Sequence, residues 1–193
     1  ILMEKVPSSE RFLTDIISAM RDFRVISLCY QGFRHPEPFC FNVRPYCVKY
    51  FKQRWYLLGD SDLGLRIYSL DRFVDMEELE EHFEIPKGFD AEEYFGNYFG
   101  VIIGEEPEDV KIRVVPDQVK YFRTLPLHGS QRETAQEDGS SVFSYHIAPT
   151  FDFVQEILSH GTDVEVLEPA ELRESVADII AGMASRYGLP VSR

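Results

Sequence analysis

The residues best suited to chemistry in this sequence are aromatic rings and arginines, which alternate between positions 30 and 72. They are Tyr30, Arg34, Arg44, Tyr46, Tyr50, Arg54, Trp55, Tyr56, Arg66, Tyr68 and Arg72. Aromatic rings stack on nucleobases, and the arginine fork holds a phosphate through two parallel hydrogen bonds. The mixture therefore favours nucleotide binding. Strands are often rich in aromatics and surfaces in arginines, so a purely structural role is the alternative.

The distribution of charge narrows where an anion could bind. The chain carries a net charge of −13, which argues against a general nucleic-acid-binding protein. Residues 10–75, however, hold ten Lys/Arg against eight Asp/Glu, whereas the remainder holds ten against 25. Only the N-terminal part offers phosphate a favourable surface. The acidic remainder would repel a long duplex, so a bound polyanion should be short or locally held.

Other chemistries have weak support in the sequence. The five histidines do not pair at metal-ligand spacing with a cysteine or carboxylate, and no Gly-rich phosphate loop or nucleophile elbow occurs. Asp60 and Asp62 could chelate a divalent cation, but no third acid follows at calcium-loop spacing, which favours a solvated hairpin loop. We therefore expect no catalytic residue, no metal and no cofactor.

Cysteine usage and hydropathy indicate the compartment. Cys29, Cys40 and Cys47 lie in apolar, strand-like sequence, which predicts reduced core residues. No apolar run approaches the roughly 20 residues that cross a bilayer, and no signal peptide is present. We expect a cytoplasmic protein with no membrane partner.

The first part of the chain reads as one helix followed by short strands. Apolar residues recur with a helical period over residues 9–22, and the period then changes to two. Strands are predicted at residues 25–30, 39–43, 46–51, 55–58 and 65–70. One helix and five short strands within some 65 residues are typical of a small, strongly bent sheet or barrel.

The second part has a different order of elements. Residues 76–108 read as a connector with a short helix after Asp90, and this connector predicts a domain boundary. Its acidic runs at residues 77–81 and 105–109 read as solvated surface, whereas its aromatic residues predict packing. Strand, helix, hairpin, helix, strand and a long terminal helix then follow, which is the ferredoxin-like βαββαβ pattern. We therefore expect an α+β protein with domains at residues 9–80 and 109–190 and a connector at residues 81–108.

The two faces of the predicted strand at residues 55–58 differ in their expected roles, one in the core and one in binding. Burying a Trp side chain contributes on the order of 4–6 kcal/mol at most, whereas stacking one base on an exposed ring contributes about 1–3 kcal/mol. The chain's single tryptophan, Trp55, is thus predicted to be core together with Leu57, and Tyr56 faces the other way. Whether Arg66 and Tyr68 lie beside Tyr56 depends on the hairpin register, which the sequence leaves open.

The motifs of the first part resemble the WYL domain. They are Pro45-Tyr46, Arg54-Trp55-Tyr56-Leu57-Leu58-Gly59 and Leu65-Arg66-Ile67-Tyr68-Ser69-Leu70-Asp71-Arg72. The second part is similar to the WCX extension of that family. Its motifs are Ser130-Gln131, Asp138-Gly139 and Gly161 followed by Val164-Glu165-Val166-Leu167-Glu168-Pro169 and Leu172-Arg173. Together the resemblance covers nearly the whole chain.

The resemblance implies a fold, a function and candidate site residues. The fold is an Sm-like, SH3-type barrel followed by a ferredoxin-like α/β sandwich. The family implies a bacterial transcription regulator whose WYL module senses single-stranded nucleic acid or a nucleotide-like effector, and which forms a homodimer. Family positions match Arg66, Arg72 and Tyr30; Arg44 and Tyr56 are added here from strand face and charge.

The leading hypothesis is thus the effector-sensing and dimerising region of such a regulator. Only eight residues precede Ser9, so promoter DNA would be read by an N-terminal helix-turn-helix that this chain does not contain. The alternative is a protein-interaction module with no nucleic-acid ligand, because both folds often serve assembly. An enzyme ranks below both, since no pair of titratable groups suggests a catalytic pocket.

Overall fold

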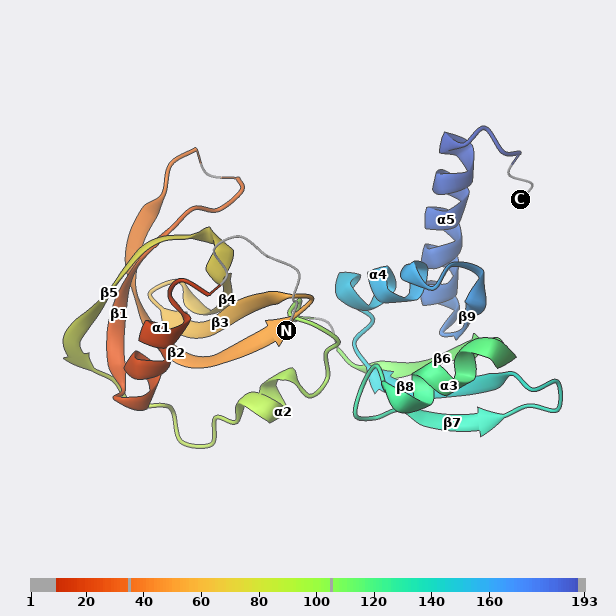
Figure 1. The fold of residues 1–193 in the computed structure, drawn as a ribbon, viewed down its shortest axis with the longest axis horizontal. Coiled ribbons are helices and arrows are strands. Elements are labelled where there is room, and N and C mark those ends of the chain that lie inside the picture. The colour runs from red at the N-terminus through yellow and green to blue at the C-terminus, as the bar shows by residue number, and fades with distance from the viewer. Residues whose placement is uncertain (1–9, 35, 105, 191–193) are drawn as a thin grey trace, which may run out of the picture. The chain divides into compact units, whose positions relative to one another are not determined.

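The computed structural model describes residues 10–34, 36–104 and 106–190 (Figure 1). It divides into two compact units, Ile1–Ala91 and Glu92–Arg193, which are described separately below.

The first unit is a helix on a strongly curved antiparallel sheet (Figure 1). Its elements are α1 (Leu13–Arg21), β1 (Arg24–Tyr30), β2 (Phe39–Phe51), β3 (Arg54–Ser61), β4 (Gly64–Ser69), the 3-10 turn η1 (Leu70–Arg72) and β5 (Phe73–His82). α1 buries Ile16 and Ala19, three residues apart, against the sheet, as the helical period predicts. The predicted helix and strand segments are all present in this unit.

Strand β2 is continuous where the sequence predicts two segments. The Arg44-Pro45 junction interrupts the pattern, but the pairing of β2 with β3 continues across it through a bulge between Pro45 and Cys47. Proline has no N–H for the ladder, and a bulge is one of the places in a sheet where it is tolerated. The bulge bends the strand without ending it.

Residues 76–82 were predicted to be part of a connector, but in the structure they belong to strand β5. The strand pairs antiparallel with β1 and forms one edge of the sheet, whose order is β4-β3-β2-β1-β5. Met76 and Leu79 are half-buried while the glutamates around them are exposed. Charged side chains are a common protection of an edge strand against further pairing. Strands β4 and β5 do not pair with each other, so the described strands form an open, curved sheet and not a closed barrel.

The core of this unit lies on the concave side of the sheet. Phe12, Ile16, Ile26, Leu28 and Leu57 are buried there, and Leu57 confirms its predicted core position. Trp55 is only half-buried and packs on the edge of this cluster, with its ring 5.0 Å from that of Tyr50. Trp55 thus packs against the core, as predicted, but it is not fully buried.

The second unit has the predicted βαββαβ order with a terminal helix. The short helix α2 (Ala91–Phe95) begins at the boundary of the two units. The elements that follow it are β6 (Glu108–Val114), α3 (Pro116–Thr124), β7 (Arg132–Ala135), β8 (Ser141–Ile147), α4 (Phe151–Ser159), η2 (Gly161–Asp163), β9 (Val164–Glu168) and α5 (Ala170–Arg186). The sheet order is β7-β8-β6-β9, with antiparallel pairs throughout. Ile112, Phe143 and Phe153 are fully buried in its core. The molecule is thus mixed α/β with two antiparallel sheets.

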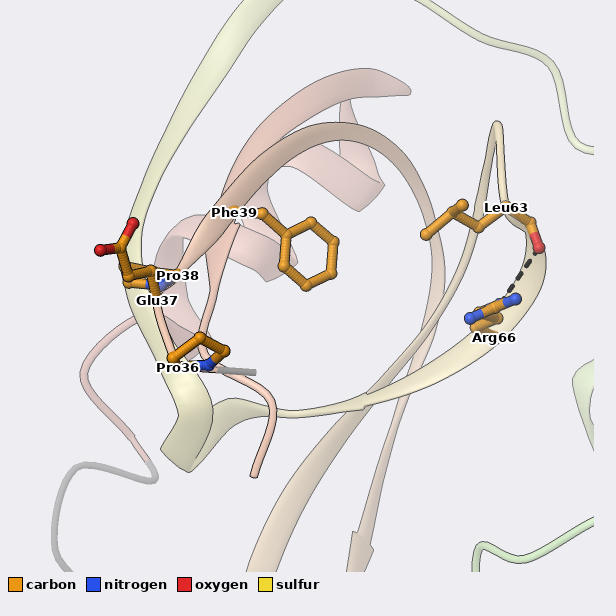
Figure 2. A pocket seen from close by; sticks show the side chains of 6 residues that line it. All are labelled: Pro36, Glu37, Pro38, Phe39, Leu63 and Arg66. Atoms are coloured by element: carbon orange, nitrogen blue, oxygen red, sulfur yellow. Dashed lines mark hydrogen bonds between the residues drawn. The ribbon is translucent and has the colours of Figure 1, made fainter. Parts of the chain in front are cut away.

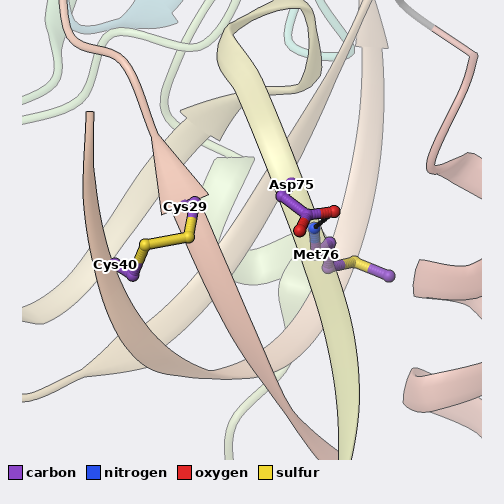
Figure 3. The surroundings of a disulfide bond; sticks show 4 residues. All are labelled: Cys29, Cys40, Asp75 and Met76. Carbon is purple, nitrogen blue, oxygen red and sulfur yellow. Dashed lines mark hydrogen bonds between the residues drawn. A yellow bond between two sulfur atoms is a disulfide. The ribbon is translucent and has the colours of Figure 1, made fainter. Parts of the chain in front are cut away.

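The cysteines differ from the prediction. Cys29 and Cys40 lie directly opposite each other on β1 and β2 and form a disulfide, and only Cys47 is free (Figure 3). The prediction of three reduced core thiols was wrong because strand-like sequence does not reveal which cysteines become cross-strand neighbours. Within the described ranges, no helix is long and apolar enough to cross a membrane, and no three metal-ligating side chains cluster.

Candidate ligand-binding site

A cavity of about 340 Å³ opens at the end of the curved sheet of the first unit. Its walls come from the end of β1, the loop that follows, the start of β2, the β3–β4 turn, β4 and η1. The lining residues are Tyr30, Gly32, Phe33, Arg34, Phe39, Leu63, Arg66, Ile67, Tyr68 and Arg72. Three predicted site residues, Tyr30, Arg66 and Arg72, are therefore brought together.

Strand register explains why these side chains meet. Tyr30 of β1 is opposite Phe39 of β2, so both side chains lie on the same face of the sheet. In the β3–β4 hairpin, Arg66 is opposite Gly59 and Tyr68 is opposite Leu57. Arg66 and Tyr68 thus share the face of Leu57 and not that of Tyr56, which answers the register question left open by the sequence.

The aromatic wall of the cavity is built around Tyr68. Its ring lies 5.5 Å from that of Tyr30 in an edge-to-face arrangement and 5.5 Å from that of Phe41. The Tyr68 hydroxyl is 3.1 Å from Ser61 Oγ, and either atom can donate the hydrogen bond. Burial raises the pKa of Tyr68, and the hydrogen bond with Ser61 partly opposes this shift. Tyr68 is therefore neutral and held in place, suited to shaping the wall.

Arg72 brings a positive charge to the opposite wall. Its backbone carbonyl accepts a hydrogen bond of 3.0 Å from the amide of Gln31, which ties η1 to the loop after β1. The guanidinium lies over the ring of Phe33, with Cζ 3.7 Å from the ring centre. Arg72 Nε is buried and has no hydrogen-bond partner among the described residues. A buried donor without a partner is costly, so this atom is suited to an acceptor supplied by a ligand.

A second cavity, of about 580 Å³, adjoins the first. It is lined by Pro36, Glu37, Pro38, Phe39, Leu63 and Arg66 (Figure 2). Phe39, Leu63 and Arg66 line both cavities, so the two form parts of one groove, called here the Tyr/Arg groove. Arg66 Nε donates to the Leu63 carbonyl at 3.1 Å, which fixes the guanidinium at the junction of the two parts.

The other two predicted site residues lie elsewhere. Arg44 makes an ion pair of 3.2 Å with Asp60 and lines a separate polar cavity of about 190 Å³ with Asn42, Asp62 and Glu81. Tyr56 is half-buried between Lys49 and Ser69 on the neighbouring strands and lines none of these three cavities. Asp60, considered above as a cation ligand, is thus paired with an arginine.

Sequence reasoning missed the apolar part of the groove. Phe33, Phe39 and Leu63 are exposed lining residues, with 80%, 38% and 47% of their surface accessible. Phe33 lies within the segment QGFRHPEP and Phe39 directly follows it; the segment reads as a simple turn because of its glycine and prolines. The available signal was a solvent-exposed phenylalanine inside a turn, an unusual place for a large apolar side chain with no role.

Comparisons with known proteins agree with the two-part architecture. Residues 11–78 match the family model of the WYL domain, and residues 106–184 match that of the WCX domain. The chain therefore belongs to the WYL-domain proteins, with a WCX domain following the WYL domain. No curated protein matches the chain in sequence.

Two solved structures are similar to the chain. One is proteasome accessory factor B/C (PafBC) of Arthrobacter aurescens, 19% identical over 96% of this chain and 28% of that one, with a TM-score of 0.39. The other is described as a CRISPR Cas-related protein, 17% identical over 91% of this chain and 51% of that one, with a TM-score of 0.53. The second likeness is one of fold. The chain spans about half of that relative and less of PafBC.

Proposed function

We propose that this chain is the effector-sensing and dimerising region of a bacterial WYL-type transcription regulator. Its Tyr/Arg groove binds single-stranded nucleic acid or a nucleotide-like ligand, and it catalyses no reaction. The observation that carries the proposal is the groove itself, in which Arg66 and Arg72 flank exposed aromatic rings within the WYL domain. In this proposal the first unit is Sm-like, the second is ferredoxin-like, and the protein works in the cytoplasm.

The chemistry of the lining residues favours an anionic ligand with a flat apolar part. The groove contains three arginines, Arg34, Arg66 and Arg72, against a single carboxylate, Glu37. Guanidinium forks bind phosphate, and Phe33 and Phe39 offer ring faces for a base. Cavities of about 300–1,000 Å³ are typical of small-molecule sites, and each part of the groove lies within that range.

Fluorescence anisotropy with a labelled single-stranded oligonucleotide tests the ligand class. Arg66→Ala and Arg72→Ala should each weaken binding by about 10- to 150-fold, since a charge-assisted hydrogen bond contributes about 1.5–3 kcal/mol. Each should also lower the slope of log affinity against log salt by about 0.7, the value for one phosphate contact on a single strand. Unlabelled mononucleotides, added as competitors, distinguish a nucleotide from a longer strand.

Arg44→Ala is the matched control, because it removes an arginine from the same unit outside the groove. It should bind like the wild type, as the Arg44–Asp60 pair is partly exposed and contributes little to stability. Wild-type affinity in both groove variants, or no binding by the wild type, contradicts the proposal.

The alternative function, an assembly module with no nucleic-acid ligand, is favoured by one feature of α5. Leu172 and Val176 are buried against the second unit, and their apolar stripe continues along the helix. Its later members, Ile179, Ile180, Met183 and Tyr187, are exposed. Residues 179–190 contain no carboxylate, although the chain holds 33. We assign this stripe to the homodimer contact of the regulator; dimerisation without ligand binding would favour the alternative.

The regulatory step would be carried by a larger protein. In the proposed arrangement, a ligand in the groove biases how two copies are placed, and so the spacing of DNA-reading domains outside this chain. Both similar structures extend well beyond the part that this chain covers. Electrophoretic mobility shifts of the full-length regulator on its own promoter, with and without the oligonucleotide, test this step.

A further inference from the structure

We propose that Cys29 and Cys40 form a reversible thiol–disulfide modification site that controls the order of the loop lining the Tyr/Arg groove. The proposal concerns the loop itself; only its consequence for ligand affinity rests on the proposed function. The two cysteines face each other across β1 and β2 (Figure 3). Of the chain between them, the described residues 30–34 and 36–39 contribute one wall of the groove.

The disulfide closes a ring around groove-lining residues. Tyr30 and Phe39, immediately inside the bond, are opposite each other and line the first cavity. In the chain between Tyr30 and Phe39, the Phe33 ring makes a cation–π contact with the Arg72 guanidinium. Pro36 and Pro38 line the second cavity. The described residues of 31–38 belong to no helix or strand, so their order depends on the two strand ends that the disulfide joins and on the few contacts they make with Arg72.

The sulfur atoms lie on the outer side of the sheet. Leu28 and Tyr30 flank Cys29 and face the concave side, as Phe39 and Phe41 do beside Cys40. Side chains alternate along a strand, so both cysteines point outward. Cys40 is exposed and Cys29 half-buried, which lets a dissolved thiol or disulfide reach the pair without disturbing the core. Asp75 of β5 is opposite Cys29 on its other side.

The third cysteine provides a contrast within the same unit. Cys47 is free and half-buried, and burial raises the pKa of its thiol. A raised pKa leaves less of the nucleophilic thiolate at neutral pH. Cys47 should therefore react slowly with the reagents that reach Cys40.

The exchange needs a low-molecular-weight disulfide as oxidant, such as oxidised glutathione. The exposed Cys40 thiolate attacks one sulfur of that disulfide, forming a mixed disulfide and releasing one thiolate. Cys29, having lost its proton to water, then attacks Cys40 Sγ and expels the second small thiolate. The protein loses two protons and two electrons, and the small disulfide gains them and becomes two thiols. Two equivalents of a reducing thiol reverse the sequence.

A cross-link at the base of the loop restricts its motion, whereas the reduced loop is held by fewer constraints. One of these is the hydrogen bond from Gln31 N to the Arg72 carbonyl. Pre-ordering a binding loop raises affinity because less conformational entropy is lost on binding. In a cytoplasmic protein, disulfides are rare and commonly act as redox signals. The groove would then bind its ligand more tightly under oxidising conditions, in which the disulfide is formed.

The test begins with a redox titration of the whole chain. The protein is equilibrated in mixtures of reduced and oxidised glutathione, quenched with a maleimide under denaturing conditions, and weighed by mass spectrometry. The mass should show three maleimide labels per chain in reducing buffer and one in oxidising buffer. The remaining label should map to Cys47. Cys47→Ser should show the same transition from two labels to none. Failure to form the Cys29–Cys40 bond at any glutathione ratio overturns the proposal.

Hydrogen exchange of residues 31–38 then measures the loop in both states. Amides there should exchange about tenfold more slowly in the oxidised protein, as local opening becomes rarer. The double variant Cys29→Ser/Cys40→Ser should behave like the reduced protein under both conditions. Equal exchange in the two states of the wild type also overturns the proposal.

Oligonucleotide binding in the two states separates this inference from the proposed function. A redox-dependent loop in a protein that binds no oligonucleotide supports the modification site and contradicts the ligand assignment. A bound oligonucleotide whose affinity is the same in both states supports the ligand assignment and overturns control by the disulfide. Affinity about tenfold higher in the oxidised state is the result expected when both hold.

Discussion

The guanidinium carbon of Arg72 lies 3.7 Å from the centre of the Phe33 ring, while Nε of the same side chain is buried without a hydrogen-bond partner among the described residues. The ring is 80% exposed, so Phe33 buries little of itself by this contact. A cation–π contact therefore fixes the direction of the arginine without using its hydrogen-bond donors. Charge, orientation and an unused donor together are the reasons for placing Arg72 at the centre of the proposed anion site.

Phe33→Ala should weaken binding of the single-stranded oligonucleotide about two- to fivefold, because an exposed cation–π contact contributes about 0.5–1 kcal/mol. Phe33→Tyr keeps the ring and should bind like the wild type. Phe151→Ala, which removes a comparably exposed phenylalanine from the second unit, is the control. Anisotropy titrations measure all four proteins. If Phe33→Ala binds as tightly as the wild type, the ring does not position the arginine.

Gly59, two residues after Trp55-Tyr56-Leu57 in β3, has a structural reason to be a glycine. A Cβ at Gly59 would collide with Val43 Cγ1 and lie 3.2 Å from the Arg44 carbonyl oxygen. Gly59→Ala should thus lower the free energy of unfolding of the first unit by about 1–3 kcal/mol, the usual cost of overpacking. Gly129→Ala is the control, since nothing lies within 4 Å of its added Cβ. Urea unfolding followed by Trp55 fluorescence measures both; an unchanged midpoint for Gly59→Ala contradicts the close packing.

The order of elements could be predicted because periodicity and turn residues are local. The helical spacing that buries Ile16 and Ala19 and the βαββαβ order of the second unit both follow from such patterns. Strand β5 escaped prediction because an edge strand exposes most of its side chains, and its glutamates resemble a solvated loop. The continuity of β2 across Pro45 was also not predicted. The bulge that accommodates this proline within the strand has no recognisable sequence pattern.

The site was predicted less completely because it depends on register. A shift of one residue would turn Arg66 and Tyr68 to the face of Tyr56, and no local signal excludes that shift. The Cys29–Cys40 pair has the same origin, since only the register of β1 against β2 makes them neighbours. Charge and ring content pointed to segments that contribute Tyr30, Arg66 and Arg72 to the groove. The partners of each side chain required the structure.

Acid should weaken the second unit through Glu133. Hydrogen bonds from Arg123 at 2.8 and 2.6 Å, and then from Ser141 at 2.6 Å, lower the pKa of Glu133 from 4.5 to about 2. Since the folded pKa lies below the ordinary one, this stabilisation is complete above pH 4.5 and is lost as pH falls toward 2. Because the pair is partly exposed to solvent, the effect should be about 1 kcal/mol.

Glu133→Gln removes the titrating group and should flatten the change of stability between pH 4.5 and pH 2. Glu174→Gln, on the exposed surface of α5, should leave that dependence unchanged. Chemical unfolding at a series of pH values, followed by circular dichroism, measures the difference. An identical pH dependence in wild type and Glu133→Gln contradicts the role of the Arg123–Glu133 pair.

The exposed stripe of α5 allows the proposed homodimer to be tested. Met183 is 51% exposed and lies on the same side of the helix as the buried Val176, seven residues earlier. A carboxylate at this position would lose its hydration in an apolar contact, so Met183→Glu should weaken the dimer about 100-fold or more. Ser185, two residues later, lies on the opposite side of the helix, and Ser185→Glu adds the same charge outside the stripe.

Sedimentation velocity over a range of concentrations distinguishes these variants. The wild type and Ser185→Glu should sediment as dimers at concentrations where Met183→Glu is monomeric. Circular dichroism should be the same for all three, because Met183 is 51% exposed and is no member of the core cluster of the second unit. If all three proteins form dimers of equal strength, α5 is not part of the dimer contact. If all three are monomers, the chain does not dimerise as proposed.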